Sequence, residues 1–150
     1  MKFWEDIVVG ERAEVGRYTF SADAIKGFAR RFDPQPFHLD DQAAADSLFG
    51  ALAASGWHTA ALTMRLLVDS DLSPAGGIVG AGFDELRWPR PVRPGDELRV
   101  ESVVLEVRAS KSRADQGVIK VRSTTLNAND EPVQVSVGHL IVPRRHAAQP

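Results

Sequence analysis

Asp33 and His38 have the residue types and the spacing that acid–base chemistry requires. They bracket the segment Asp-Pro-Gln-Pro-Phe-His, in which two prolines restrict the backbone and predict a stiff, extended loop. An Asp and a His that converge on one spot can activate a water molecule, because imidazole changes charge near neutral pH and a carboxylate accepts or returns a proton. A structural explanation is also open, since an Asp before a proline loop often ends a helix and a single His is more often a structural group.

The composition is that of one globular domain, which we expect to span residues 1–150 with a frayed tail over about 144–150. Hydrophobic residues make up 43% and charged residues 25% of the chain, and a net charge of −2 gives no bulk attraction to nucleic acid. Cysteine is absent, which excludes disulfides, thiolate nucleophiles and Cys-based zinc sites. No run approaches the ~20 apolar residues of a membrane span, so we expect a soluble, cytoplasmic protein that binds neither nucleic acid nor membrane.

The first half of the chain predicts one strand and then helices. Residues 13–20 favour a strand, and Ser21 can cap a helix that ends at Phe32. Asp40 is a candidate cap for a short helix through residues 42–45. The segment 55–68 predicts a longer helix that is apolar around most of its circumference, which is typical of a buried helix.

The second half predicts strands that follow a glycine-rich connection over residues 73–82. Turn residues separate four β-favouring segments: 83–88, 97–108, 117–126 and 133–142. This order indicates an α+β domain in which an antiparallel sheet wraps around a buried central helix. Because the chain has too little helix to cover both faces of the sheet, we expect oligomerisation, most often as a twofold dimer, with a possible site between subunits.

Two of these strands carry finer signals. The apolar positions of 97–108 change parity, which predicts a bulge near Glu101 and Ser102. In the last strand His139 shares a face with alternating valines. Because nothing acidic lies beside it in sequence, we interpret His139 as a structural or interface residue.

Three separated sequence blocks carry a family resemblance. Residues 33–40 are similar to an Asp-x-Asn-Pro-x-His-x-Asp motif, and Phe28-Ala29 precedes them. Ser55-Gly56-Trp57 falls where the family has His-Gly-Met or His-Gly-Trp, and the segment 86–98 contains the Pro-Gly-Asp turn. On these blocks the chain resembles the MaoC-like dehydratases and (R)-specific enoyl-CoA hydratases of the hot-dog fold, over nearly its whole length.

The resemblance implies reversible syn addition of water to a trans-2-enoyl thioester of CoA or an acyl carrier, which gives a 3-hydroxyacyl thioester. Asp33 and His38 would activate and position the water, and a proton would be delivered to the α-carbon. The Gly56 N–H would polarise the thioester carbonyl from the start of the buried helix. No cofactor and no metal are implied.

The chain departs from the family pattern at positions that touch this site. The family's Asn is Gln35, which is one methylene longer, and the family's His before the glycine is Ser55, which still suits a helix cap. Some hydratases carry a helical serine at the position of Met64, and Thr59 or Thr63 is a candidate substitute.

Substrate-binding and phosphate-binding candidates surround these residues. We expect the substrate to contact Gln35, Pro36, Phe49, Ser55 and Trp57, with the two aromatic residues along the acyl chain. Guanidinium groups bind phosphate in a fork geometry, which makes basic residues of the later segments candidates for contact with CoA phosphates: Arg87, Arg90 and Arg93, with Lys111 and Arg113 further along.

Other functions remain open on the sequence. Hot-dog thioesterases generally use a carboxylate on the central helix, and residues 56–68 contain no Asp or Glu, which favours a hydratase. A non-catalytic thioester-binding or partner subunit is the second alternative. A metal site is disfavoured, because the candidate ligands His38, Asp40, Asp41 and His58 match no known helical ligand pair.

Overall fold

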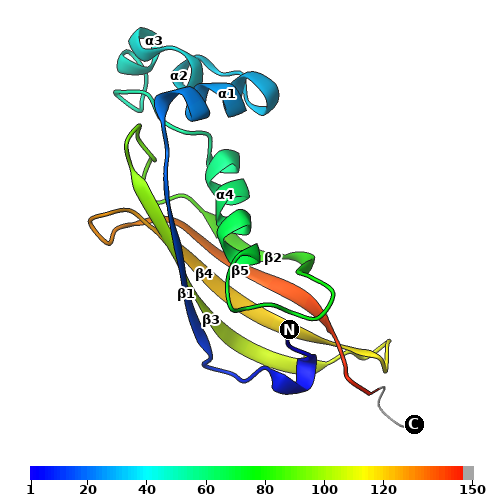
Figure 1. Cartoon of the computed structure of the whole chain (residues 1–150). Helices are drawn as coiled ribbons and strands as arrows, with labels where there is room; N and C mark the ends of the chain where they lie inside the picture. Colours follow the sequence, from blue (N-terminus) through cyan, green and yellow to red (C-terminus); the bar gives the residue numbers. More distant parts are fainter. Residues whose placement is uncertain (147–150) are drawn as a thin grey trace.

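The computed structural model describes residues 1–146, and its main element is a five-stranded antiparallel sheet. The strands are β1 (Arg12–Thr19), β2 (Val79–Arg87), β3 (Glu97–Ala109), β4 (Gln116–Leu126) and β5 (Pro132–Pro143). Their order across the sheet is β1-β3-β4-β5-β2, so β1 and β2 form its two edges. The sheet curves along one long helix, α4 (Gly56–Val68), which confirms the predicted α+β hot-dog arrangement (Figure 1).

The remaining helices gather beyond the N-terminal end of α4 (Figure 1). They are α1 (Ala22–Phe32), α2 (Pro36–Leu39) and α3 (Asp41–Ala45), while a single turn of 3-10 helix, η1 (Trp4–Asp6), lies near the other end of the sheet. The predicted caps are present: Ser21 Oγ accepts from the Ala24 N–H, and the Asp40 carboxylate accepts from the Ala43 N–H. These caps satisfy orphan donors of the first helical turns. They also fix where α1 and α3 begin.

The proline segment is helical rather than extended. Gln35 keeps the extended conformation that precedes a proline, but Pro36 starts the α2 turn. The His38 N–H donates to the Gln35 carbonyl at 3.0 Å, and the Asp40 N–H donates to the Pro36 carbonyl at 3.0 Å. The prediction of an extended loop is wrong here because the first helical position tolerates proline, which lacks a donor that would be orphaned there anyway.

Two strand details also differ from prediction. β2 begins at Val79, since the glycine-rich residues pair with β5 and place Val79 opposite Ile141. The irregularity of β3 against β4 lies between Val104 and Glu106, not at Glu101 and Ser102. Ser102 is only 5% exposed, because every second residue of β3 faces inward and Ser102 is one of them. Since serine is polar, the hydrophobic pattern of the sequence did not reveal this.

The core lies between α4 and the inner face of the sheet. A main cluster unites Phe20, Ile25, Leu62, Leu66 and Leu98 with neighbouring apolar residues. A second cluster, which includes Ile119 and Val142, packs beneath η1. Burial of these side chains supplies the main stabilisation of the fold.

Several buried residues on the inner face of the sheet are polar: Ser102, Ser123, Thr125, Gln134 and Ser136. Thr63 of α4 reaches them with its Oγ1 2.6 Å from Thr125 Oγ1 and donates to the Thr59 carbonyl at 2.9 Å. A buried hydroxyl without a partner is costly, so these contacts fix α4 against β4.

His139 lies on the outer face of the sheet. Gln134 and Ser136 belong to the face that α4 covers, and Val133, at the irregularity of β5 against β4, also packs into the main core cluster. His139 Nε2 is 2.8 Å from Asp84 Oδ1, and Lys120 Nζ is 3.1 Å from the other oxygen of that carboxylate. The acidic partner that is missing in the local sequence is thus supplied by the neighbouring strand β2. A lowered pKa of Asp84 follows from its hydrogen bonds with His139 and Lys120.

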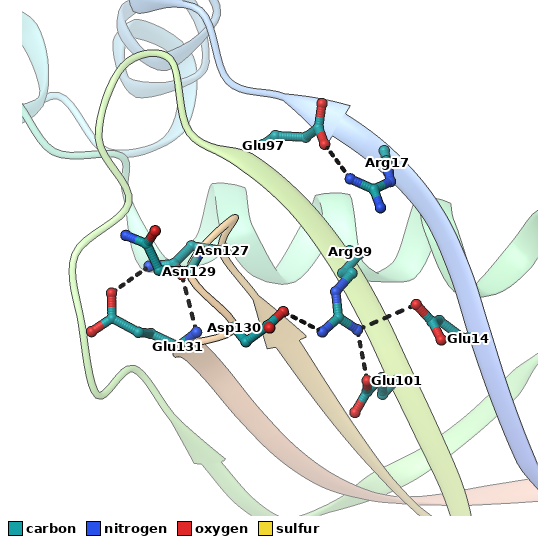
Figure 2. Close-up of polar contacts among 9 residues, drawn as sticks. All are labelled: Glu14, Arg17, Glu97, Arg99, Glu101, Asn127, Asn129, Asp130 and Glu131. Carbon is teal, nitrogen blue, oxygen red and sulfur yellow. Dashed lines mark hydrogen bonds and ion pairs between the residues drawn. The ribbon is translucent and has the colours of Figure 1, made fainter.

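A second ion-pair group ties the β4–β5 turn to the other edge of the sheet. Figure 2 shows the Arg99 guanidinium between Asp130 of the turn, Glu101 of β3 and Glu14 of β1. The hydrogen bonds that Arg99 donates to Asp130 and then to Glu101 raise the pKa of Arg99. Asp130 has φ 60°, a left-handed conformation that is common for Asp in tight turns.

The chain remains anchored past the end of β5, although a frayed tail is predicted from about residue 144. The Arg144 N–H donates to the Asp115 carbonyl at 2.9 Å, and its guanidinium lies 4.8 Å from the Trp4 ring centroid. The Arg145 N–H donates to Glu5 at 3.0 Å. The remainder of the predicted tail, 147–150, lies outside the described residues. Within residues 1–146 the helices are too short or too polar for a transmembrane span.

Candidate active site

Asp33 and His38 meet at the junction of α1 and α2. Asp33 directly follows α1, where its N–H donates to the Ala29 carbonyl at 2.9 Å. His38 lies in α2, is 4% exposed, and places Nε2 3.3 Å from Asp33 Oδ2. The α2 turn therefore brings the carboxylate and the imidazole into contact.

The imidazole of His38 has a fixed orientation. Its Nδ1 lies 2.6 Å from the Ala53 carbonyl oxygen. Because a carbonyl oxygen only accepts hydrogen bonds, Nδ1 carries a hydrogen and donates it. Nε2, beside Asp33, is then the ring atom that is available for proton exchange. Phe37 and Phe49 contact the ring at centroid distances of 4.6 and 5.8 Å and hold it in place.

Asp33 is held as a carboxylate by two hydrogen-bond donors. Ser55 Oγ donates to Oδ2 at 2.7 Å, and Gln35 Nε2 donates to Oδ1. Burial raises the pKa of Asp33, but the hydrogen bonds from Ser55 and Gln35, together with the charge of His38 when it is protonated, outweigh burial, so the pKa is lowered overall. The two residues that depart from the family pattern therefore both contact this carboxylate.

Gly56 is the first residue of α4 and offers its N–H at the start of the helix. Ser55 caps that end, where its Oγ accepts from the Trp57 N–H at 3.3 Å. Among residues 1–146 no acceptor takes the Gly56 N–H, which lies at the positive end of the helix dipole. A Cβ at Gly56 would lie 2.6 Å from Trp88 Cε2, so the close approach of the indole excludes any larger residue.

A cavity of about 330 Å³ lies beside two of these groups. His38 and Gly56 line it together with Phe49, Trp88 and Arg90, and the remaining lining is mainly apolar. A concave, mostly apolar site with a few convergent polar groups is typical of a small-molecule site. We refer to it as the catalytic cavity.

The predicted substrate contacts separate into two groups. Phe49 lines the catalytic cavity, while Ser55 and Gln35 lie behind it as partners of Asp33. Pro36 starts α2 and is exposed. Trp57 is 58% exposed and packs edge-on against Trp88 at a centroid distance of 5.3 Å.

The three candidate phosphate ligands have different surroundings. Arg93 donates to the carbonyls of Phe49 at 2.6 Å and Ala51 at 2.7 Å, so its guanidinium stabilises the segment before α4. Arg87 pairs with Glu85 on β2 at 2.6 Å. Arg90 pairs with Glu131 at 2.9 Å and lines the catalytic cavity, which makes it the arginine nearest the site.

Further along the chain, Arg113 pairs with Asp115 at 2.9 Å. Lys111 lies beside it in the β3–β4 turn and lines a separate surface depression. Neither residue lines the catalytic cavity.

Two contributors to the site were not singled out from the sequence. Trp88 lies in the block that carries the family resemblance, and an aromatic residue directly before Pro-Arg-Pro is a signal for it. Ala53 acts through its backbone carbonyl, which has no sequence signature.

The residues that were considered and disfavoured as metal ligands have other partners. Asp40 caps α3, and Asp41 pairs with Lys26 at 2.8 Å. His58 packs between Phe20 and Phe28, and burial lowers its pKa to about 4. Among residues 1–146 there is no group of three or more His, Cys, Asp or Glu side chains placed to hold a metal ion.

Known proteins match this chain in sequence and in structure. Residues 8–127 match the model of the MaoC like domain. The crystal structure of a MaoC-like dehydratase from Rhodospirillum rubrum superposes with a TM-score of 0.93 at 57% identity, over 97% of this chain and 99% of that chain.

Two curated relatives match over most of their length. An uncharacterised protein of Bacillus subtilis, YdeM, is 28% identical over 92% of this chain and 95% of its own. A 3-hydroxybutyryl-CoA dehydratase of Methylorubrum extorquens is 30% identical over 99% of this chain and 88% of its own. Two other curated relatives are longer, and the chain spans 29% of one and 21% of the other.

Proposed function

Because the chain belongs to the MaoC-like domain family, we propose that it is a hydratase or dehydratase that adds water reversibly to a trans-2-enoyl thioester of CoA or an acyl carrier. The product is a 3-hydroxyacyl thioester. The observation that carries the proposal is the contact between His38 Nε2 and Asp33 Oδ2 at 3.3 Å, beside a cavity that also contains Gly56. The name of the Methylorubrum extorquens relative supports the same reaction class.

His38 is the better base of the pair. Hydrogen bonds from Ser55 and Gln35 lower the pKa of Asp33 and make its carboxylate a weak base, whereas imidazole exchanges protons near neutral pH. His38 Nε2 takes a proton from water as the oxygen adds to the β-carbon, and Asp33 stabilises the imidazolium. The imidazolium then gives one proton to the α-carbon from the same face, which restores neutral His38 and completes a syn addition.

Gly56 stabilises the enolate that forms during this step. Its N–H lies at the start of a 13-residue helix, where the helix dipole favours negative charge. A single preorganised donor to such an oxyanion contributes about 3–4 kcal/mol in the transition state. In the bound substrate, the CoA or carrier portion extends out of the cavity beside Arg90.

The direct test offers crotonyl-CoA to the purified protein and follows both the conjugated enoyl absorbance and the free thiol. Loss of absorbance without thiol release supports the hydratase. Thiol release identifies a thioesterase, and absence of both signals with retained thioester binding identifies a binding subunit. The absence of any Asp or Glu from α4 favours the first outcome.

The working form in this proposal is a homodimer. An apolar stripe along α4 is exposed at Trp57, Met64 and Val68, at 58%, 40% and 57%, and edge strand β2 exposes Val79 and Phe83 at 50% and 62%. Within residues 1–146, β2 pairs only with β5, so its other edge has unpaired backbone groups there. A second copy related by a twofold axis presents the same β2 edge and the same α4 stripe. In this proposal, antiparallel pairing of the two β2 strands covers the β2 edge and the α4 stripe of both copies.

A further inference from the structure

One short segment of the chain contacts both members of the proposed catalytic pair. Residues 49–55, which we call the connecting segment, lead from the short helices to the start of α4 (Figure 1). The Ala53 carbonyl accepts the Nδ1–H of His38, and the Ser55 hydroxyl donates to Asp33. The geometry of the pair therefore depends on where this segment lies.

The Arg93 guanidinium holds the first half of the connecting segment. Its Nη2 donates to the Phe49 carbonyl at 2.6 Å. Its Nη1 donates to the carbonyls of Ala51 at 2.7 Å and Leu52 at 3.4 Å. Because a guanidinium presents its donors in a rigid, planar fork, it fixes these carbonyls relative to one another.

The residue before Arg93 fixes the direction of the Ala53 carbonyl. The Ala54 N–H donates to the Val92 carbonyl at 2.9 Å. A peptide unit is planar and trans, so the Ala54 N–H and the Ala53 carbonyl lie in one plane and point in opposite directions. The bond to Val92 therefore aims the Ala53 carbonyl at His38 Nδ1, which lies 2.6 Å away.

Arg93 itself is anchored to the core through the turn before β3. Its N–H donates to the Asp96 carboxylate at 2.8 Å, and the Asp96 N–H donates to the Arg93 carbonyl at 3.0 Å. The Gly95 N–H donates to the carbonyl of the buried Phe20 at 2.7 Å, and the Phe20 N–H donates to the Asp96 carbonyl at 2.9 Å. The turn thus gives the guanidinium a fixed base on the sheet.

We propose that Arg93 is a positioning residue for His38, whose side chain holds the connecting segment so that the Ala53 carbonyl keeps the ring hydrogen on Nδ1. This inference rests on the proposed function. Neutral imidazole has one ring hydrogen, and the hydrogen bonds of the two nitrogens decide which of them carries it. The opposite tautomer has a partner too, since Asp33 Oδ2 lies 3.3 Å from Nε2 and would accept a hydrogen from it. In that tautomer Nε2 only donates and takes no proton from water.

The kinetic test compares Arg93→Met and Arg93→Lys with the wild type. Met is similar in length but has no donor, and the single ammonium of Lys keeps the charge without the fork. We expect kcat for crotonyl-CoA to fall at least about tenfold in Arg93→Met, because a small displacement of a catalytic group is costly, and to fall less in Arg93→Lys. KM should change little. If Arg93→Met does not fold, the same comparison is made with Arg93→Lys alone.

Crotonyl-pantetheine, which lacks the phosphates of CoA, separates this role from phosphate binding. Positioning of His38 predicts the same loss of kcat with crotonyl-pantetheine and with crotonyl-CoA. A rise in KM that is confined to crotonyl-CoA, with kcat unchanged, would make Arg93 a phosphate ligand and would overturn the proposal.

NMR of protein with nitrogen-labelled histidine measures the tautomer without turnover, at a pH at which the ring is neutral. The spectrum of His38→Gln assigns the His38 signals by their loss. In the wild type we expect a protonated Nδ1 and an unprotonated Nε2, whose chemical shifts differ widely. In Arg93→Met both shifts should move toward those of the opposite tautomer. Unchanged shifts would overturn the proposal even if kcat falls.

Arg99→Met is the matched control, because Arg99 also joins separate segments but pairs with Glu101 and Asp130 and is not among the described residues that line the catalytic cavity. It should leave kcat and the His38 signals unchanged. If the wild type hydrates crotonyl-CoA and Arg93→Met retains both kcat and the tautomer, the positioning role is wrong and the proposed function stands. If the wild type hydrates no enoyl thioester, the proposed function is wrong and the catalytic role of Arg93 falls with it.

Discussion

In the proposed mechanism, Asp33 and His38 have different roles because their hydrogen-bond partners differ. Ser55 and Gln35 donate to Asp33 and keep it ionised, whereas the Ala53 carbonyl takes the Nδ1 hydrogen of His38 and leaves Nε2 for proton transfer. A carboxylate held in this way orients the imidazole and stabilises its charged form. We therefore expect a loss of either side chain to affect turnover more than binding.

Asp33→Asn and His38→Gln should each lower kcat for crotonyl-CoA hydration by two or more orders of magnitude. Asn keeps the shape of Asp33 without its charge, and Gln retains a polar group without the proton exchange of imidazole. Steady-state kinetics with circular dichroism as the folding control checks this prediction. Near-native turnover in either variant would remove that residue from the mechanism.

Ser55→Ala should shift the acidic limb of the pH–rate profile to higher pH. It should also lower kcat/KM about tenfold, since a hydrogen bond to a charged group contributes about 1.5–3 kcal/mol. The donor at 2.7 Å lowers the pKa of Asp33, so its removal lets that pKa rise and protonates the carboxylate at higher pH. Ser55→Thr keeps a hydroxyl at this position and should retain the native limb. An unchanged limb in Ser55→Ala would mean that Ser55 serves only as a helix cap.

At the scale of elements, the burial of His58 between α1 and α4 makes the packing of the two helices sensitive to acid. The imidazole stacks on Phe28 at a centroid distance of 4.6 Å, and burial lowers its pKa to about 4. The unfolded chain binds this proton near pH 6.5, so the stabilisation is complete above that pH and is lost as the pH falls toward 4.

His58→Phe should remove this acid sensitivity. The wild type should lose about 1–2 kcal/mol of unfolding free energy between pH 6.5 and 4 through this group, a figure reduced for its partial access to solvent. Urea unfolding of both proteins at the two pH values measures the difference. Equal pH dependence of the two proteins would show that His58 titrates normally.

Elements whose signals are local were predictable from the sequence. Ser21 and Asp40 mark where α1 and α3 begin, and the apolar run from residue 56 marks α4. The inner face of the sheet was not predictable, because Ser102, Gln134 and Ser136 are polar yet buried by tertiary contacts. Because buried polar residues do not show in the hydrophobic pattern, the bulge was predicted near Ser102 instead of between Val104 and Glu106. For the same reason the valines of β5 were assigned to one apolar face.

The site was predictable to a similar extent. Asp33, His38 and Gly56 follow from motif spacing, and the structure places His38 and Gly56 on one cavity and Asp33 in contact with His38. The Ala53 carbonyl and the bond between Trp88 and Gln134 depend on segments far apart in sequence. Such contacts exist only once the sheet and α4 are assembled.

At the scale of the whole molecule, the dimer is the proposal with the largest structural consequence. Phe83→Asp places a charge in the middle of the exposed apolar face of β2, where Phe83 is 62% exposed in the single chain. The fold of one chain should tolerate the change, while desolvation of the charge at a subunit interface should disfavour association. Light scattering after size-exclusion chromatography should then show a fall from twice the chain mass of 16.4 kDa to that mass.

Val9→Asp is the matched control for this experiment, since Val9 is 60% exposed in the segment before β1 and lies outside both the α4 stripe and β2. It introduces the same charge at an equally exposed apolar residue and should leave the mass at that of the wild type. If Phe83→Asp keeps the native mass while the wild type is dimeric, the interface lies on another surface. If the wild type is itself a monomer, the stripe and the β2 edge are exposed in solution, and activity measured on that monomer decides whether one chain contains a complete site.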